Sequence, residues 1–453
     1  MTSKPIVRFA PSPTGYLHVG NIRTALVNWL YAKKNGGEFH LRLDDTDAER
    51  SKPEFEAAIK EDLTWLGMEW DDYSRQRARF DQYEAAKEKL IASGRLYPCW
   101  ETQEELDIKR KMLISRGQPP IYDRGALKLS DEQKAALEAE GKKPHYRFLL
   151  EDKPIEWDDL IRGTVRFEGT HMSDPVLVRE DGVPLYTFCS VVDDGDFHTT
   201  HILRGEDHVS NTAVQMQIFE ALGLTQPTFG HMALIKTKTG ELSKRTGGGD
   251  VRSLRAQGLE PMTINSYLAK IGTSDAIDVF ADMDALLDSF DLSKFGRAAA
   301  NYDPEELERL NAKLVSQLSF DEVKSRLPDG VDAQFWETVR PNLTRVDDAK
   351  DWWQIVHESS GVVDAEDEAF LSQAATMLPP EPWDESSFKA WTKTVQAETG
   401  RKGKGLFMPI RKALTGMEHG PELGPLFLLL GQQKVAARLN GQNATQGAAT
   451  ATP

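Results

Sequence analysis

Residues 6 to 51 alternate short apolar runs with polar loops in a pattern that predicts half of a nucleotide-binding fold. Ile6 to Phe9 has the length and composition of a buried strand, and a loop rich in proline, serine and glycine follows it. From His18 onward, apolar residues recur at helical spacing until Gly36 and Gly37 end the pattern. A second strand-like run, Phe39 to Leu43, leads into a cluster of aspartates. The predicted order is therefore strand, loop, helix and strand.

The same periodicities predict an interruption of this fold and its later return. Pro53 to Gly67 and Tyr83 to Gly94 have helical spacing of apolar residues. From Tyr97 to about Ser173 the chain changes to charged helical segments broken by proline and glycine, which is typical of an insertion. The apolar runs Val176 to Arg179 and Leu185 to Val192 then resume the nucleotide-binding fold.

The last third of the chain shows only helical periodicity. Asp303 and Pro304 form a helix start, in which a capping residue precedes a first-turn proline. Further helices are predicted at Phe335 to Leu343, Ala349 to Glu358, Glu368 to Met377, Phe388 to Thr399, Leu406 to Met417 and Leu426 to Leu439. Five tryptophans at helical spacing in this region are expected in its core, with stacking on unpaired bases as the alternative: Trp336, Trp352, Trp353, Trp383 and Trp391.

Composition places the chain among large globular proteins. Its 453 residues suggest two to four folding units. No apolar run approaches the length of a membrane span, and the first nine residues show no signal-peptide pattern, so we expect a soluble cytoplasmic protein with no membrane partner. Its two cysteines, Cys99 and Cys189, are too few for a disulfide framework or a thiolate zinc cage.

The charge balance narrows the possible partners. The chain has 55 Lys and Arg against 71 Asp and Glu, a net charge of −16, which argues against indiscriminate nucleic-acid binding. A local basic surface is nevertheless enough for a specific nucleic acid. Two basic clusters are present: Lys236, Lys238, Lys244, Arg245, Arg252 and Arg255, and later Arg401, Lys402, Lys404, Arg411 and Lys412.

The loop before the first helix has the chemistry of a phosphate site. A helix that begins near His18 and Gly20 directs backbone N–H groups and the positive end of its dipole at a ligand in front of it. Gly15 and Gly20 permit close backbone approach, and His18 can donate a hydrogen bond to a phosphate oxygen. The alternative is a structural turn capped by a solvated histidine, and this segment alone does not decide between the two.

Two separated motifs resolve that question by resemblance. Residues 10 to 21, APSPTGYLHVGN, resemble the first signature of class I glutamyl-tRNA synthetases, and residues 242 to 245, LSKR, resemble the second. Asp45-Thr46-Asp47 and Arg50-Ser51 lie between them in the expected order, and the resemblance covers nearly the whole chain. It implies an α/β fold: a class I synthetase Rossmann-type nucleotide-binding domain with an α+β insertion, followed by an all-α anticodon-binding half.

The resemblance and the patterns together predict six parts of the chain. The insertion is expected to hold the acceptor end of a tRNA, and Gly403 to Arg411 resembles the anticodon-binding end. The parts are 1–96, first half of the Rossmann catalytic domain; 97–173, connective insertion; 174–249, second half with the LSKR loop; 250–320, helical linker that contacts the tRNA stem; 321–440, anticodon-binding domain; and 441–453, a tail expected to be disordered because it has almost no large apolar residue.

The resemblance also implies an activity and its substrates. The chain is expected to activate L-glutamate with ATP and Mg²⁺ and to transfer it to the 3′ end of tRNA(Glu), working as a monomer. An enzyme that charges tRNA(Gln), alone or in addition, and a non-catalytic tRNA-binding paralogue stay open as alternatives. Some relatives bind zinc near residue 99 through a cysteine pair, but this chain has only Cys99 followed by Trp100, so no structural zinc and no metal ligand are predicted.

Site residues follow by matching this chain to the family motifs. Lys244, on a glycine-rich loop, is expected to stabilise charge on the leaving pyrophosphate, although the LSKR loop alone is equally compatible with a solvated basic turn. The predicted catalytic residues are His18, Lys244 and Arg245. The predicted ATP-binding residues are Gly15, His18, Gly20, Asn21, His208, Ser243 and Lys244.

The predicted glutamate site matches opposite charges to the substrate. Arginine forks bind carboxylates bidentately, and a carboxylate binds an ammonium group. The residues are Arg8, Ser12, Asp44, Tyr186, Ser190 and Arg204. Ordinary strand-end charges are the alternative for Arg8 and Arg204. The chain departs from many relatives at Asp44, which replaces a glutamate, and at Asn21, which replaces a second histidine.

Overall fold

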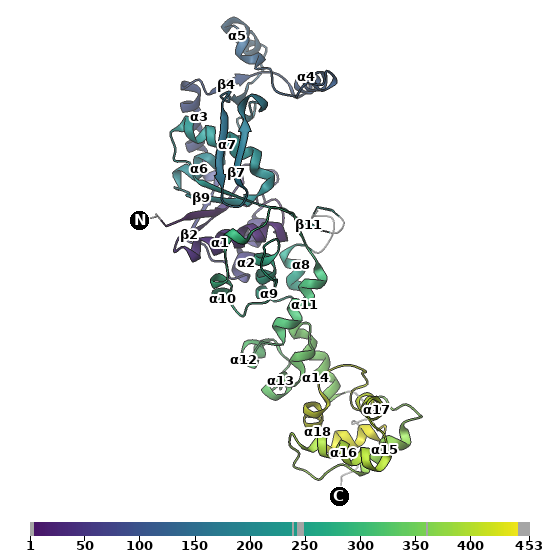
Figure 1. Ribbon diagram of the computed structural model, residues 1–453. Helices are drawn as coiled ribbons and strands as arrows, with labels where there is room; N and C mark the ends of the chain where they lie inside the picture. The colour runs from purple at the N-terminus through teal and green to yellow at the C-terminus, as the bar shows by residue number, and fades with distance from the viewer. Residues whose placement is uncertain (1–3, 238–239, 242–248, 359–360, 443–453) are drawn as a thin grey trace. The chain divides into compact units, whose positions relative to one another are not determined.

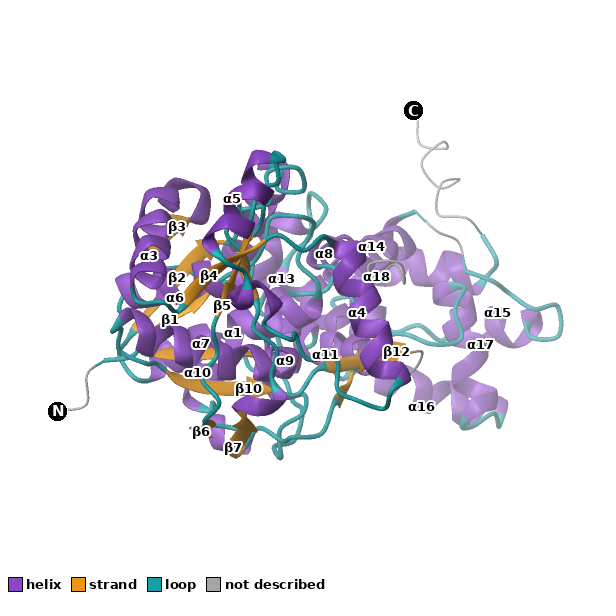
Figure 2. Cartoon of the chain, turned by 90° about the horizontal axis from the view of Figure 1, so that it is seen from above, coloured by secondary structure: helices purple, strands orange, loops and turns teal. Residues whose placement is uncertain are grey.

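The computed structural model describes residues 4–237, 240–241, 249–358 and 361–442 (Figure 1). The chain divides into two compact units, and residues 257–263 belong with the second. The first unit holds residues up to Ala256 and Ile264 to Asp303, and the second continues from Pro304. All strands that the structure describes, drawn in orange in Figure 2, belong to the first unit by their residue ranges. The tail predicted to be disordered lies outside the described residues beyond 442.

The first half of the catalytic unit forms a parallel sheet in the order β1-β2-β3. Strands β1 and β2 are almost fully buried toward their carboxyl ends, whereas β3 at the edge is half-buried or exposed, and α1 carries a buried apolar face against the sheet. This confirms the predicted order of strand, loop, helix and strand. The elements are β1 (Ile6–Phe9), α1 (Val19–Lys34), β2 (Glu38–Leu43), α2 (Pro53–Trp65) and β3 (Asp72–Arg75).

The second half adds a pair of parallel strands beside β1. The elements are α6 (Tyr186–Asp196), β9 (His201–Gly205), α7 (Val209–Leu222) and β10 (Thr228–Met232). The backbone N–H of Thr200 donates to the carbonyl oxygen of Ile6 at 2.9 Å, which places β9 against β1. The strand order reverses between β1 and β9, and such a switch point is where open parallel sheets bind ligands.

The predicted insertion contains a small antiparallel sheet and a separate hairpin. The sheet has the order β4-β5-β8 and the hairpin pairs β6 with β7. The expectation that Val176 to Arg179 resumes the nucleotide-binding fold is wrong, because Val176 to Val178 forms β8 and pairs antiparallel with β5 of the insertion. Helices α4 and α5 bury none of their residues. The elements of this region are α3 (Phe80–Ala92), β4 (Leu96–Cys99), α4 (Gln103–Ser115), α5 (Asp131–Ala139), β5 (His145–Phe148), β6 (Pro154–Asp159), β7 (Gly163–Glu168) and β8 (Val176–Val178).

One hydrophobic cluster connects the insertion with the nucleotide-binding fold. Phe148 and Ile155 of the insertion belong to the same buried cluster as Phe188 and Phe219 of α6 and α7. The first unit ends with further elements: β11 (Ile235–Thr237), β12 (Gly240–Glu241), α8 (Val251–Ala256), α9 (Pro261–Lys270), α10 (Met283–Asp288) and β13 (Ala300–Asn301). Because the core is shared, the hairpin is held rigidly against the strands that it covers.

The second unit is helical, as predicted. Three of the five tryptophans lie in its core, and Trp353 and Trp383 are partly buried against it. Trp336 and Trp391 are buried, and Trp391 stacks on Phe427 with ring centroids 5.2 Å apart. Helix α18 is broken at Gly431, where φ is 70° and ψ is 166°. The helices are α11 (Pro304–Val315), α12 (Phe320–Val323), α13 (Ala333–Val339), α14 (Ala349–His357), α15 (Glu368–Thr376), α16 (Ser387–Thr399), α17 (Lys404–Thr415) and α18 (Leu423–Leu439).

Two observations bear on the environment of the chain. Cys99 and Cys189 are both buried free thiols, and burial raises the pKa of Cys99 to about 12, so this thiol stays protonated at neutral pH. In the part of the chain that the structure describes, no helix is long and apolar enough to span a bilayer.

Candidate active site

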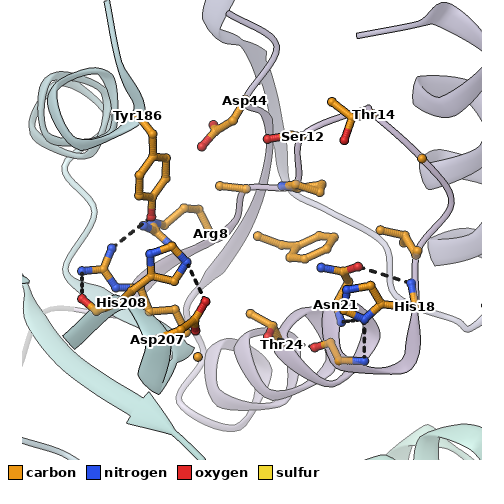
Figure 3. Close-up of a pocket in the computed structure, with 18 of the residues that line it drawn as sticks. Arg8, Ser12, Thr14, His18, Asn21, Thr24, Asp44, Tyr186, Asp207 and His208 are labelled. Carbon is orange, nitrogen blue, oxygen red and sulfur yellow. Dashed lines mark hydrogen bonds and ion pairs between the residues drawn. The ribbon is translucent and has the colours of Figure 1, made fainter. Parts of the chain in front are cut away.

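A cavity of about 700 Å³ opens where the strands of the parallel sheet end. Arg8 near the end of β1, Asp44 just after β2, Arg204 in β9 and Met232 at the end of β10 all line it. Figure 3 shows Arg8, Asp44 and Tyr186 on one side of this cavity and His18 with Asn21 on the other. The fold therefore brings the two predicted groups of site residues to opposite ends of one pocket.

His18 caps helix α1 at the second of these ends. Its Nδ1 accepts hydrogen bonds from the backbone N–H groups of Gly20 at 3.1 Å and Asn21 at 3.4 Å. The side-chain oxygen of Asn21 accepts from the N–H of His18 in return, at 3.3 Å. The expectation that this helix presents unpaired N–H groups to a phosphate is thus wrong for this conformation, because the cap residue already satisfies them.

The cap also determines which nitrogen of His18 carries the proton. A ring nitrogen that accepts cannot be protonated, so Nε2 holds the proton of the neutral imidazole and is a donor. Glycine at position 20 suits the same geometry, since a Cβ there would lie 3.0 Å from Cε1 of His18, which is closer than ordinary contact. Gly15 lines the cavity beside these residues.

The segment that follows the LSKR loop is attached to this helix start. The N–H of Val19 donates to the carbonyl of Gly249 at 2.8 Å, and the N–H of Val251 donates to the carbonyl of Leu17 at 3.0 Å. Ser243, Lys244 and Arg245 themselves lie outside the described residues. The described chain resumes at Gly249 and Asp250 directly beside His18, at this end of the pocket.

A buried ionic network supports the opposite end. Arg8 binds Asp194 through Nε at 3.0 Å and Nη2 at 3.2 Å, and Arg42 binds the same aspartate through Nη1 at 2.8 Å. Arg42 also binds Asp44, with Nε donating to Oδ1 at 2.7 Å. Although burial raises the pKa of Asp194, Arg8 and Arg42 together hold it below its usual value. The two predicted substrate-binding charges, Arg8 and Asp44, are thereby joined through one aspartate and one arginine.

Sequence analysis missed both connecting residues. Arg42 lies in an apolar strand between Leu41 and Leu43, and Asp194 ends an apolar run, so both could have been noticed as charges in buried positions. Their pairing was invisible because 152 residues separate them. The neighbouring Asp193 accepts from Gln76 at 2.9 Å and is buried as well, which extends the network toward α3.

Two residues of the predicted glutamate site differ from expectation in their surroundings. Ser190 is fully buried behind the cavity, with Arg42 as its nearest recorded donor at 3.5 Å, and it does not line the pocket. Asp44 does line the pocket, but both its oxygens accept from Arg42. Burial raises the pKa of Asp44 to about 6, so its negative charge depends on pH near neutrality.

Arg204 is the most unusual charge in the pocket. Its side chain is almost completely buried, and its strongest hydrogen bonds go to neutral acceptors, Thr212 and Gln215, each at 2.7 Å. No carboxylate contacts it among the residues that the structure describes, and burial lowers its pKa. A buried cation without a counter-charge is costly, so this position favours an anionic ligand.

Tyr186 and His208 complete this end. Nη1 of Arg204 donates to the hydroxyl oxygen of Tyr186 at 3.1 Å, which leaves the hydroxyl proton to be donated elsewhere. The ring of His208 lies 5.3 Å from that of Tyr186, so this predicted ATP-binding residue lies beside the predicted glutamate site (Figure 3). Ser12 lies near Asp44 in the same view and is exposed to the cavity.

The second unit has its own pocket, of about 850 Å³, between α13, α16, α17 and the start of α18. Lys404, Phe407 and Arg411 line it. Nη1 of Arg411 is buried without a recorded hydrogen-bond partner within the described part of the chain. Two other cations of this basic cluster are neutralised, because Arg401 pairs with Asp367 and Lys412 pairs with Asp364. The pocket thus combines apolar walls with two cations and three carboxylates, those of Glu337, Glu385 and Glu422.

Metal-binding geometry is not found in the described ranges, where no group of three or more His, Cys, Asp or Glu side chains could hold an ion. At the position where some relatives bind zinc, Sγ of Cys99 lies 3.7 Å from the hydroxyl of Tyr122. That hydroxyl donates to Glu101 at 2.9 Å, and Lys109 also binds Glu101, at 3.2 Å. The segments around Cys99, Lys109 and Tyr122 are thus connected by hydrogen bonds and by the ammonium group of Lys109.

Two family models match the chain in sequence order. Residues 5–309 match the catalytic domain of class I tRNA synthetases of the E and Q type, which are those for glutamate and glutamine. Residues 346–442 match an anticodon binding domain. The matches confirm the predicted fold class, an α/β synthetase domain followed by a helical half.

Individual relatives agree over nearly the full length. The chain is 54% identical to a glutamate–tRNA ligase of Azospirillum brasilense over 97% of this chain and 99% of that protein. It is 52% identical to glutamate–tRNA ligase 2 of Erythrobacter litoralis over 95% of this chain and 97% of that protein. Among solved structures, it resembles a glutamate tRNA ligase from Elizabethkingia meningosepticum in complex with its amino acid, with a TM-score of 0.84, 28% identity, and coverage of 97% and 99%.

Proposed function

The chain belongs to the family of class I tRNA synthetases for glutamate and glutamine, and we propose that it acts as a glutamate–tRNA ligase. The observation that carries the choice of glutamate is Arg204, a buried cation in the pocket with only neutral hydrogen-bond partners recorded. The side-chain carboxylate of glutamate supplies the missing negative charge, whereas the amide of glutamine does not.

In the first step, an oxygen of the glutamate α-carboxylate attacks the α-phosphorus of Mg·ATP. The bond from that phosphorus to the bridging oxygen breaks, pyrophosphate leaves, and glutamyl-adenylate remains. Both reactants are anions, so the protein's task is to align them and to stabilise the charge that develops. Nε2 of His18 donates to a phosphate oxygen, and Lys244 with Arg245 and Ser243 binds the departing phosphates; Mg²⁺ arrives with ATP as part of the substrate.

In the second step, a hydroxyl of the 3′-terminal adenosine of tRNA attacks the carbonyl carbon of the adenylate, and AMP leaves. The substrate amino acid is held by Arg204 and Arg8 at its side chain and by Asp44 at its ammonium group. The proposal places His208 at the boundary between amino acid and nucleotide, and leaves Ser190 as a buried support. No protein nucleophile is needed, because the substrates supply every reacting atom.

The tRNA is bound, in this proposal, by the insertion and by the second unit. The insertion holds the acceptor end, and the pocket of the second unit takes an unpaired anticodon base, stacked on Phe407 and hydrogen-bonded by Arg411. Aromatic stacking and an arginine fork are the usual means of reading single-stranded bases. We place the enzyme in the cytoplasm as a monomer, and sedimentation analysis of the purified chain tests the monomer.

Glutamate-dependent exchange of pyrophosphate into ATP, measured with and without purified tRNA, tests the proposal. We expect exchange with glutamate when tRNA is present, and little with glutamine. Inactivity with every tRNA would reject catalysis and favour a non-catalytic tRNA-binding protein. Charging separated tRNA(Glu) and tRNA(Gln) in the same preparation decides between an enzyme specific for tRNA(Glu) and one that also, or only, charges tRNA(Gln).

A further inference from the structure

A histidine behind the pocket accepts a hydrogen bond from the substrate-binding arginine. Nε of Arg204 donates to Nε2 of His231 at 3.3 Å, and the hydroxyl of Thr212 lies 2.9 Å from the same nitrogen. His231 is completely buried in β10, directly opposite Arg204 in the register of the β9–β10 pair. It does not line the cavity, so any effect that it has on a substrate acts through Arg204.

The other ring nitrogen of His231 is bound by a carboxylate from the insertion. Nδ1 lies 2.5 Å from Oδ2 of Asp159, the last residue of β6. The second oxygen of Asp159 accepts from three backbone N–H groups, those of Ile161 at 3.1 Å, Arg162 at 3.0 Å and His231 at 3.0 Å. Although burial alone raises the pKa of Asp159, these hydrogen bonds lower it to about 2, so the group is ionised.

These contacts fix the tautomer of the ring. An ionised carboxylate can only accept, so Nδ1 carries the proton and Nε2 keeps its lone pair for Arg204. Burial lowers the pKa of His231, which keeps the ring neutral near pH 7. A neutral acceptor holds the guanidinium in one orientation without cancelling its positive charge. The charge therefore stays available to a ligand in the pocket.

The same turn holds the strand ends on both sides of Arg204. Nη1 of Arg162 binds Glu206 at 2.5 Å, and the other oxygen of Glu206 accepts from the N–H of Leu234 at 3.2 Å. The N–H of Leu160 donates to the carbonyl of Phe229 at 2.9 Å. The turn between β6 and β7 is thus attached to β9 and β10 where these strands deliver Arg204 to the cavity.

We propose that Asp159 and His231 are positioning residues that orient Arg204 toward the side-chain carboxylate of the amino acid, so that the β6–β7 turn sets the affinity and selectivity for glutamate. The proposal rests on the glutamate–tRNA ligase activity proposed above. Nε and Nη2 of Arg204 already donate to His231, Thr212 and Gln215, and one N–H of Nη1 donates to Tyr186. A rotated guanidinium would therefore redirect the remaining N–H of Nη1 away from the carboxylate. The nucleotide end of the pocket does not depend on this orientation.

A matched pair of substitutions distinguishes the hydrogen bond from Arg204 to His231 from the packing of the His231 ring. His231→Gln can place an acceptor near the position of Nε2, whereas His231→Asn can replace only the group near Nδ1. In pyrophosphate exchange with tRNA present, we expect His231→Asn to raise the KM for glutamate about tenfold. His231→Gln is expected to stay within about threefold of the native chain, with the KM for ATP within about twofold in both.

Asp159→Asn gives a second test at unchanged side-chain size. The amide oxygen can keep the three backbone N–H bonds, so the amide nitrogen then faces Nδ1 and donates to it. The imidazole proton is forced onto Nε2, where it opposes the N–H of Arg204. We expect a rise of about tenfold or more in the KM for glutamate and a reduced preference for glutamate over glutamine, with the melting temperature within a few degrees of native.

The outcomes of these tests distinguish the inference from the proposed function. If the native chain shows no glutamate-dependent exchange, the proposed function fails. If the native chain is active but Asp159→Asn and His231→Asn leave the KM for glutamate unchanged, or if His231→Gln and His231→Asn raise it equally, the positioning role is wrong. A fall in kcat with unchanged KM would also overturn it, because orientation of a binding arginine acts on substrate saturation.

Discussion

At the amino-acid end of the pocket, charged hydrogen bonds of 2.8 to 3.2 Å join Arg8 and Arg42 to Asp194. At the nucleotide end, the neutral ring of His18 accepts hydrogen bonds from the backbone N–H groups of Gly20 and Asn21 at the start of α1. The first arrangement is buried and joins two strands to helix α6, which is far from them in sequence. The second is local, within four residues of the helix start. A buried ionic network is costly to rearrange, and a local cap is not.

This difference indicates that the amino-acid end mainly determines the affinity for glutamate and that the nucleotide end mainly determines the rate of activation. The amino-acid end is organised before the substrate arrives, so changes there should appear mainly in the KM for glutamate. The nucleotide end depends on the His18 cap and, in the proposal, on the LSKR loop of residues 242–245. Changes at either should therefore appear mainly in the rate of glutamate activation. Four predictions test this assignment of KM effects to one end and rate effects to the other, in order from the largest expected effect to the smallest.

Replacing Lys244 by Ala should lower the rate of pyrophosphate exchange by about 10² to 10³-fold, because one donor to developing charge is removed. The KM for glutamate should change by less than about twofold. Lys236→Ala, an exposed lysine in β11 just before the loop, is the control and should retain native kinetics. Native exchange kinetics in Lys244→Ala would show that Lys244 does not stabilise the leaving pyrophosphate. The claim that the nucleotide end determines the activation rate would then fail.

Replacing Arg204 by Ala should raise the KM for glutamate about 100-fold, since a buried charged contact is worth roughly 2 to 5 kcal/mol in a complex. The KM for ATP should stay near native. Arg166→Ala removes an exposed arginine of the β6–β7 hairpin that pairs with Glu168, and serves as the control. Unchanged glutamate saturation in Arg204→Ala would show that the amino-acid end has been misplaced.

Two substitutions of His18 separate its cap from its proposed contact with phosphate. Asparagine is a good helix cap, so His18→Asn should keep stability, whereas His18→Ala should lose about 1 kcal/mol of unfolding free energy. Both should lose about tenfold or more in activation rate, because neither retains the Nε2 donor. Urea unfolding and pyrophosphate exchange measure the two effects; a fully active His18→Asn would reduce His18 to a structural cap.

The pH dependence of glutamate saturation probes Asp44. Its carboxylate attracts the substrate ammonium only when ionised, and burial raises its pKa to about 6, so protonation weakens binding as pH falls through that value. The KM for glutamate should rise roughly fourfold between pH 7.5 and 5.5. In Asp44→Asn it should be higher throughout and nearly constant over this range. An equal pH response in both proteins would assign the titration to another group.

The sequence predicted those parts of the molecule that depend on local patterns. The strand, loop and helix around His18 followed from periodicity and turn residues, and the helices of the second unit agree with their predicted ranges to within a few residues. Gly431 was the exception, since a glycine inside an apolar helical pattern gives no local sign of whether the helix breaks there.

The parts that escaped prediction depend on distant pairings. Arg42 of β2 meets Asp194 of α6, and Asp159 of β6 meets His231 of β10, only when separate segments of the chain pack together. No local pattern records which buried charge meets which. Ser190 was expected in the pocket by resemblance, but it is fully buried and does not line it. The N–H groups of Gly20 and Asn21 were expected to be unpaired because histidine is not among the usual helix-capping residues.

The ratio of kcat/KM for glutamate to that for glutamine, measured by pyrophosphate exchange with tRNA present, tests the central claim most directly. A buried Arg204 without a recorded carboxylate partner should favour the anionic side chain by at least about 100-fold, and Arg204→Ala should remove most of that preference. A native ratio within about tenfold of unity, or a ratio unchanged in Arg204→Ala, would contradict the account.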